Sequence, residues 1–198
     1  IDRIAEETLQ VIDQEFPVEV GRADSHPEDT GPPPSVPAGA VRVEAVASGY
    51  VQLCDRERLL ALAREHGLTI YQEHGVGEFV VQGNPFVSIV SQDPLTDEIR
   101  DVCIDCFELG ESRTMQQDFQ FGIRQIVDMA LKAISPAIND PSTANTCLDH
   151  LARILCHLAR RRILPIEMRD PVNGRLLMVR HAATFRGSLD LAFNQMRQ

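Results

Sequence analysis

The sequence has little that would tie the protein to nucleic acid. Basic residues are in the minority, with 19 Lys and Arg against 29 Asp and Glu and a formal net charge of −10. Binding to nucleic-acid phosphates requires clustered Lys and Arg, so this balance argues against a nucleic-acid partner. The one dense cationic run, Arg160 to Arg162, is typical of a helix end.

Features of a disulfide scaffold and of a membrane span are also missing. The five cysteines lack the spacing of a disulfide framework, which indicates a reducing compartment. No apolar run approaches the ~18 residues that span a bilayer, and there is no signal-peptide pattern. The chain does not begin with Met, and a helical pattern is already running at Ile1. We therefore expect the sequence to continue from an upstream membrane region.

What is present is a globular chain of 198 residues, 43% hydrophobic and 24% charged. Apolar residues recur at helical spacing from Ile1 to Phe16, and Pro17 ends the pattern. We assign residues 1–20 to an amphipathic helix continuing from the upstream region. The stretch from Gly21 to Gly39 has five prolines and almost no large apolar residue, so residues 21–40 are predicted to be a linker.

Residues 41–91 are predicted to form a small β-rich module that carries one helix. Apolar residues alternate with polar ones in "VRVEAVASGYVQL" and "EFVVQGNPFVSIV", which indicates strands separated by Ser-Gly and Gly-Asn-Pro turns. Between them, "DRERLLALAREHG" has Asp55 as the N-cap of a helix and Gly67 at its end.

Residues 92–198 are predicted to form a helical module with a short β-hairpin. The helical period returns after Pro94, with helices expected at residues 95–109, 114–134 and 141–163. A hairpin is expected around the Asn-Gly pair of Asp170 to Arg175, followed by a last helix from about Phe185. The fold class predicted for the whole chain is α+β.

The stretch "ALKAISPAINDPSTANTCLDH" carries an Asn-Asp-Pro between two apolar helical runs. Pro136 removes a backbone donor, so the preceding helix is predicted to end or kink there. Asp140 is placed as an N-cap with Pro141 at the first helical position, which is a strong start signal for the next helix.

A ligand is the alternative interpretation of the same turn. The exposed amides of the helix start, with Asn139, Ser142 and Thr143, could bind an anion or a polar ligand. Asp140 would repel an anion, which favours the cap interpretation.

The helix expected at 114–134 combines an apolar face with rows of polar residues. Arg124 and Asp128 are spaced to pair at i, i+4. Gly122 costs about 1 kcal/mol against Ala in mid-helix, which favours close approach of another helix there. We expect a buried network in which Arg124 and Asp128 lock this helix against the Asn139-Asp140 turn.

Two pairs of potential zinc ligands form a weaker candidate site. "CIDC" supplies Cys103 and Cys106, and "CLDH" supplies Cys147 and His150, a Cys-Cys-Cys-His set if their helices face each other. Cysteine is also among the most buried residue types. The favoured interpretation has no metal and no cofactor.

The long motif of this chain resembles a known family. The segments "FGIRQIVDMALKAISPAINDPSTA" and "TCLDHLARIL", with "SGYVQ", "GEFVVQGNPF" and "LDLAFNQMR", are similar to the bacterial membrane-protein family called domain of unknown function 2254. The resemblance implies a domain that follows several N-terminal membrane-spanning helices. The family has no established activity, so no catalytic residue is implied. The matching motif positions are Gln117, Asp118, Phe121, Gly122, Arg124, Gln125, Asp128, Ser135, Pro136, Asn139, Asp140 and Pro141.

Two function classes follow. The favoured one is a binding or regulatory module on the cytoplasmic side of a bacterial inner membrane, in a transporter- or channel-like context. We expect this module to associate with copies of itself through the glycine-containing face of 114–134 and the apolar stripe of 1–16. The alternative is a membrane-tethered enzyme with a polar constellation. The residues predicted to bind a ligand or to form a structural motif are Gln117, Asp118, Arg124, Gln125, Asp128, Ser135, Asn139, Asp140, Ser142 and Thr143.

Overall fold

The computed structural model describes residues 1–16, 35–163, 166–181 and 183–197. Most of the predicted linker, residues 21–34, lies outside the described residues. Six α-helices and two sheets occur in the described ranges, so the α+β fold class is confirmed. Of these residues, 1–16, 114–163 and 183–197 form a helical unit, and 35–113 and 166–181 form a sheet unit.

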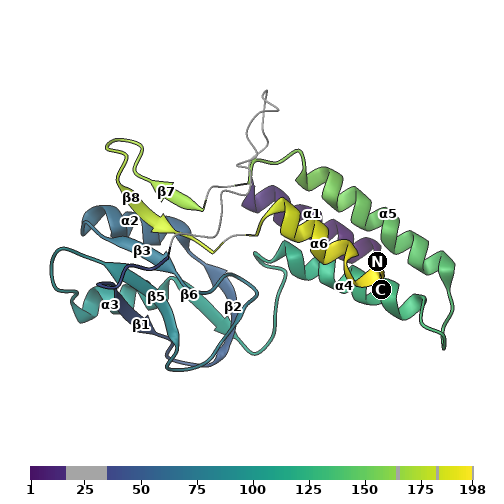
Figure 1. The fold of residues 1–198 in the computed structure, drawn as a ribbon, viewed down its shortest axis with the longest axis horizontal. Coiled ribbons are helices and arrows are strands. Elements are labelled where there is room, and N and C mark those ends of the chain that lie inside the picture. Colours follow the sequence, from purple (N-terminus) through teal and green to yellow (C-terminus); the bar gives the residue numbers. More distant parts are fainter. Residues whose placement is uncertain (17–34, 164–165, 182, 198) are drawn as a thin grey trace. The chain divides into compact units, whose positions relative to one another are not determined.

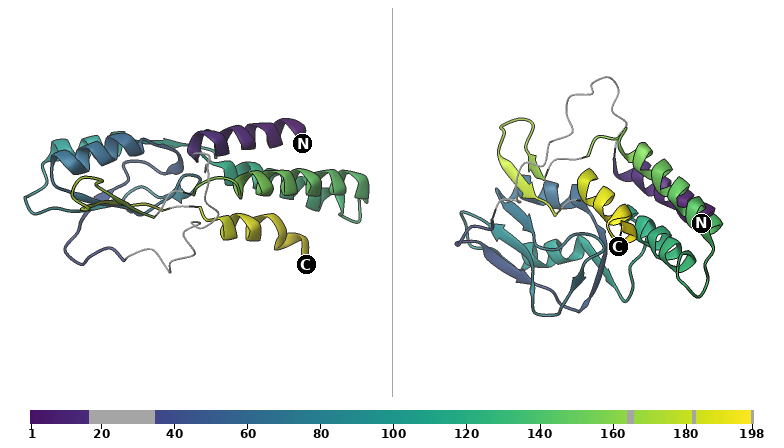
Figure 2. Two further views of the ribbon diagram at one scale, coloured as in Figure 1. Left: turned by 90° about the horizontal axis from the view of Figure 1, so that it is seen from above. Right: turned by 45° about the vertical axis from the view of Figure 1, so that its right-hand side comes forward.

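The helical unit is built on an antiparallel pair of helices, α4 and α5. Helix α1 packs on one side of this pair and α6 on the other (Figures 1 and 2). The bounds are α1 Asp2–Glu15, α4 Phe119–Ala133, α5 Pro141–Leu158, α6 Phe185–Phe193 and the short 3-10 helix η1 Gln195–Arg197.

The core of this unit is the apolar face that each helix carries in its sequence. The fully buried side chains include Ile12 of α1, Ile123 and Ile126 of α4, and Leu151, Ile154 and Leu158 of α5. Of the helix predicted at residues 1–20, the part from Asp2 to Glu15 is confirmed, and residues 17–20 lie outside the described residues. Its apolar stripe is covered by α4 and α5 within the same chain.

Gly122 lies where α1 crosses α4. A Cβ at this position would overlap Thr8 Oγ1 and would lie 3.0 Å from Thr8 Cβ. Thr8 is fully buried, and its hydroxyl donates to Ile4 O at 2.6 Å. The predicted close approach of another helix at Gly122 is therefore present.

The sheet unit contains a five-stranded sheet and a three-stranded sheet. The larger has the order β1-β5-β3-β8-β7 and the smaller β4-β2-β6. All neighbours are antiparallel except β3 and β8, which are parallel. The bounds are β1 Val41–Glu44, β2 Gly49–Cys54, β3 Thr69–Gln72, β4 Phe79–Val80, β5 Pro85–Val90, β6 Phe107–Gly110, β7 Glu167–Arg169 and β8 Leu176–Val179.

Two helices complete the sheet unit, α2 Arg56–Glu65 and α3 Asp97–Asp105. Asp55 caps α2 as predicted, since its side chain accepts from Arg58 N at 3.0 Å. Gly67 follows α2 with φ +68°, a left-handed conformation that glycine adopts without a steric penalty. The predicted hairpin is also confirmed, with β7 and β8 antiparallel around Gly174.

One predicted helix is wrong at its C-terminal end. The helix expected at 95–109 ends at Asp105, and Phe107–Gly110 is strand β6, paired with β2. Pairing with β2 satisfies the backbone groups of this segment, and the Phe107 ring packs 4.5 Å from that of Phe86.

The helices expected at 114–134 and 141–163 are present but shorter. The first begins at Phe119, after the capping residue Asp118, and the second ends at Leu158. Residues 92–113 and the β7–β8 hairpin belong to the sheet unit, whereas we assigned them to the helical module. The reason is strand pairing, because β6 joins β2 and β8 joins β3.

Candidate functional site

The α4–α5 turn holds the centre of the predicted motif. Asp140 is the N-cap of α5 and accepts from Thr143 N at 3.1 Å, from Ser142 Oγ at 2.6 Å and from Thr143 Oγ1 at 2.5 Å. These hydrogen bonds lower the pKa of the Asp140 carboxyl from 3.8 to about 2. Pro141 occupies the first turn of α5 as predicted. The carboxylate is thus engaged by its own helix start, which supports the cap interpretation over a ligand at this turn.

The residues just before the cap complete the turn. Ser135 Oγ donates to Lys132 O at 2.7 Å, which helps to end α4. Asn139 is exposed and has φ +46°, a left-handed conformation in which Asn is enriched. Ser135, Asn139, Asp140, Ser142 and Thr143 are therefore brought together, as parts of one helix–turn–helix connection.

Asp118 lies at the other end of α4. It is buried and caps this helix, with its side chain accepting from Phe121 N at 3.0 Å. Since α4 has 15 residues, about 22 Å of helix separates this cap from the turn at Asp140. Gln117 precedes the cap and Gln125 lies in mid-helix, both partly exposed.

The predicted buried lock between Arg124 and the Asn139-Asp140 turn is wrong. Arg124 Nε lies 3.0 Å from Asp128 Oδ1, so the i, i+4 pair forms, but the two side chains are 38% and 55% exposed. Asp140 is bound by Ser142 and Thr143 instead. The polar row of α4 faces outward because the opposite face of the helix supplies the core.

The four candidate zinc ligands divide between the two units. Cys103 and Cys106 lie on and just after α3, buried in the core of the sheet unit. Cys147 is buried in the core of the helical unit, and His150 Nε2 lies 2.9 Å from Asp2 Oδ1. Within the described ranges, no group of three or more His, Cys, Asp and Glu side chains gathers as a metal site.

The buried thiols are poor nucleophiles. Burial raises the pKa of Cys54 and of Cys103 to about 12 and that of Cys106 to about 11. A thiolate is the reactive form of cysteine, so these groups are inert at neutral pH. Cys156 differs from them because it is exposed on α5.

Sequence reasoning missed a series of ion pairs between α1 and α5, which we call the α1–α5 ladder. Its members are Asp2 with His150 at 2.9 Å, Glu6 with Arg153 at 2.8 Å, and Asp13 with both His157 at 2.5 Å and Arg161. The residue numbers of the partners increase in the same direction along both helices, so α1 and α5 run parallel. A signal was present in the sequence, because the acidic residues of α1 and the basic residues of α5 recur mostly at spacings of three, four or seven.

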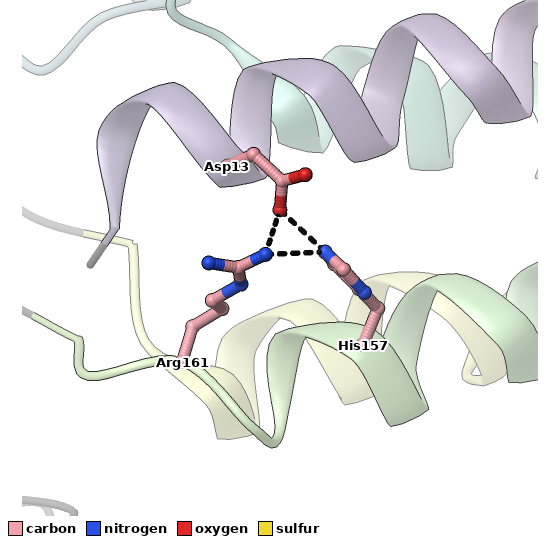
Figure 3. Close-up of polar contacts among 3 residues, drawn as sticks. All are labelled: Asp13, His157 and Arg161. Atoms are coloured by element: carbon pink, nitrogen blue, oxygen red, sulfur yellow. Dashed lines mark hydrogen bonds and ion pairs between the residues drawn. The ribbon is translucent and has the colours of Figure 1, made fainter. Parts of the chain in front are cut away.

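The last contact of the ladder is a triangle of three side chains (Figure 3). The Asp13 carboxylate bonds both His157 Nε2 and the Arg161 guanidinium, and those two nitrogens lie 3.1 Å apart. His157 is 31% exposed and Arg161 12%. The triangle fixes the end of α1 against the end of α5.

A cavity of about 460 Å³ lies along the ladder. Its lining includes Glu6 and Asp13 from α1, Arg153, Cys156 and His157 from α5, and Arg160 just after the end of α5. Cys156 and His157 both line it, and His157 Nε2 contacts Asp13 across it. The contacts at this cavity therefore join two helices.

The chain matches a family model over its whole length. The model is described as "Predicted membrane protein (DUF2254)" and covers residues 1–198. The chain belongs to this family. The resemblance drawn from the motif is thus confirmed. The DUF2254 motif positions include the two helix caps, the turn before the second cap, the outer row of α4 and Gly122, which packs against α1.

Two similar DUF2254-like chains come from mycobacteria. The uncharacterized proteins Mb1321c of Mycobacterium bovis and Rv1290c of Mycobacterium tuberculosis are each 34% identical to this chain over 203 residues. The match takes in 100% of this chain and 38% of each relative. The chain thus spans well under half the length of these relatives. No solved structure gives a significant match.

Among the residues that the structure describes, no helix is both long and apolar enough to cross a membrane.

Proposed function

We propose that this chain is the extramembrane domain of a bacterial inner-membrane protein, on its cytoplasmic side, where it acts as a binding or regulatory module. One observation carries the proposal. The family is described as predicted membrane proteins, whereas no described helix of this chain could span a bilayer, and the chain corresponds to 38% of its relatives.

The packing of α1 supports the role of connector to a membrane region. Its apolar face is in the core with α4 and α5, and its polar face is tied to α5 by the ladder. A displacement of α1 would therefore have to break both sets of contacts. In this proposal an upstream membrane region continues into α1, which transmits its position to α5.

The cytoplasmic side is supported by the cysteines. All five are free thiols, and four of them are buried. Free thiols persist where glutathione and thioredoxin keep them reduced.

A membrane-tethered enzyme has less support. The polar residues on which it would depend are divided between the two ends of α4 and its outer face, about 22 Å apart at the extremes. Catalysis requires such groups to converge on one reacting atom.

Self-association stays part of the proposal but needs a different surface. The apolar stripe of α1 and the Gly122 face of α4 are both used inside the chain. The outer face of α5 is exposed and carries Asn145, Leu148 and Ala152 at helical spacing. We propose that copies meet through this face.

Light scattering tests the self-association. Leu148→Glu should convert the oligomer into a monomer, because a charge at the centre of the contact would be desolvated. Leu189→Glu on α6 is the matched control, since the two leucines are 38% and 39% exposed. A monomeric wild-type chain at high micromolar concentration would end this part of the proposal.

The membrane proposal is tested on the full-length protein with a C-terminal tag. The protein should sediment with the inner membrane and resist extraction by high salt and alkali. Protease should remove the domain from inverted vesicles and spare it in spheroplasts. Recovery of the full-length protein in the soluble fraction would contradict the proposal, and cleavage in spheroplasts would place the domain on the opposite side.

A further inference from the structure

The α4–α5 turn exposes apolar side chains that the cap function does not require. Ile134 is 51% exposed and Ile138 is 48% exposed. Pro136 and Ala137, between them, are also exposed. Four of the six residues from 134 to 139 are therefore apolar and turned to the outside.

Most backbone N–H groups of the same turn form hydrogen bonds within the chain. The following amides all donate to backbone carbonyls of the turn or of the end of α4: Ile134 to Ala130 at 3.0 Å, Ser135 to Lys132 at 3.3 Å, Ile138 to Ser135 at 3.0 Å, Asn139 to Ser135 at 2.8 Å and Asp140 to Ala133 at 2.8 Å. Pro136 has no amide hydrogen. Paired donors lower the cost of moving the turn out of bulk water, and the interfacial layer, unlike the hydrocarbon core, still offers partners to the carbonyls of the turn.

The turn also projects beyond the start of α1. Asp2 lies beside His150, whereas α5 begins at Pro141, nine residues earlier. Nine helical residues correspond to about 13 Å. Figures 1 and 2 show the start of α1 and the α4–α5 turn at the same end of the helical unit, with the turn further out.

We propose that the turn of residues 134–139 docks into the interfacial layer of the lipid bilayer. The inference rests on the proposed function, because a chain that enters α1 from a membrane region has this end of the helical unit directed to that membrane. The turn, being further out than Ile1, then reaches the lipid first. Ile134 and Ile138 enter the boundary between headgroups and acyl chains, to the shallow depth typical of interfacial segments.

The flanking polar residues suit this placement. Lys132 is exposed one half-turn before Ile134, so its ammonium group can remain at the headgroup level. Asp140 is held by Ser142 and Thr143 on the side of α5.

The test uses the whole chain, tethered by an N-terminal histidine tag and a flexible linker to vesicles of phosphatidylcholine and phosphatidylglycerol with a nickel-chelating lipid. Cys156→Ser removes the exposed thiol, and Ala137→Cys carries a nitrobenzoxadiazole label on the turn. The control label is at Gln14→Cys, an exposed position near the far end of α1, about 18 Å along that helix from Asp2.

The label at residue 137 should shift its emission to shorter wavelength and be quenched several-fold more strongly by headgroup-region spin-labelled lipid than the label at residue 14. Adding Ile134→Ser and Ile138→Ser should reduce the quenching at residue 137 to the level of the control. Equal quenching at both positions in the tethered chain would overturn the proposal.

A second copy of the chain bound at the turn would give a different fluorescence result. A blue shift that depends on protein concentration without vesicles would show that a second copy covers the turn, and would refute lipid docking. Because the tether is artificial, the result does not depend on the origin of the chain. A failure of the proposed function appears separately, as soluble full-length protein in the fractionation.

Discussion

Replacing Gly122 by Ala tests how α1 is held against α4. Alanine has the higher helix propensity, which alone would stabilise the helical unit by about 1 kcal/mol. The added methyl group, however, would overlap Thr8 Oγ1 and lie 3.0 Å from Thr8 Cβ. Thr8 is fully buried and β-branched, so it has little freedom to move aside.

Overpacking of this kind costs about 1–3 kcal/mol. Subtracting the propensity gain leaves a predicted loss of about 0–2 kcal/mol in the free energy of unfolding for Gly122→Ala. The substitution should therefore not give the stabilisation that a mid-helix Gly→Ala change gives at an exposed site.

A double-mutant cycle isolates the contact. Thr8→Ala removes the overlapping atom, so Gly122→Ala should be less harmful in that background, with a coupling free energy of about 0.5–3 kcal/mol. Thr8→Val is the matched control, because it keeps a γ carbon in place of the hydroxyl and should give no rescue. Since the chain has no Trp, unfolding in urea is followed by far-UV circular dichroism. A stabilised Gly122→Ala variant whose effect adds to that of Thr8→Ala would refute the close contact.

Three shorter predictions concern single side chains. Arg124→Ala should change the free energy of unfolding by only ~0–1 kcal/mol, because its ion pair with Asp128 is exposed; a loss of about 3–5 kcal/mol in urea would restore the buried lock. The lowered pKa of Asp140 stabilises the folded chain above its ordinary value of 3.8, and this contribution is lost as pH falls towards about 2. Asp140→Asn keeps a capping side chain, so its thermal midpoint should vary less over that pH range than that of the wild type, and equal slopes would contradict the assignment. Maleimide should modify one thiol per folded chain, Cys156, as read by intact mass, since the other four are buried; early labelling at Cys147 would show that the helical core opens.

The parts of the fold that depend on local signals were predictable from the sequence. Asp55 and Asp140 were identified as helix caps, and each accepts a backbone N–H three residues on. A cap, a following proline or a glycine in left-handed conformation acts within a few residues, so the sequence contains the complete signal.

Strand β6 and its pairing were not predictable in the same way. "FELG" alternates in period two, but four residues after a helix are too few to separate a strand from a further helical turn. The decision comes from β2, whose backbone is distant in the sequence and satisfies that of β6.

In the candidate site, too, local features were predictable and contacts between distant segments were not. Its caps were found, but the α1–α5 ladder was not, because the polar faces of α1 and α5 have meaning only once the helices are known to be parallel neighbours. Conversely, the polar row of α4 was given a buried partner that it lacks in the structure. Charge patterns alone do not distinguish a solvated row from a paired one.

The parallel pairing of β3 with β8 has a consequence for biosynthesis and for dissection of the protein. Ile70 is paired with Met178, so the larger sheet receives β8 only after α4 and α5 have been translated. Closing this long loop is entropically costly and slows folding through non-local contacts. An expression fragment that stops near Arg113 would leave one edge of β3 unpaired and prone to aggregation. Nor can the helical segments be excised as one continuous piece, because the β7–β8 hairpin is inserted between α5 and α6. A truncation directly after α5 would thus remove β7 and β8 from the sheet unit and α6 from the helical unit at the same time.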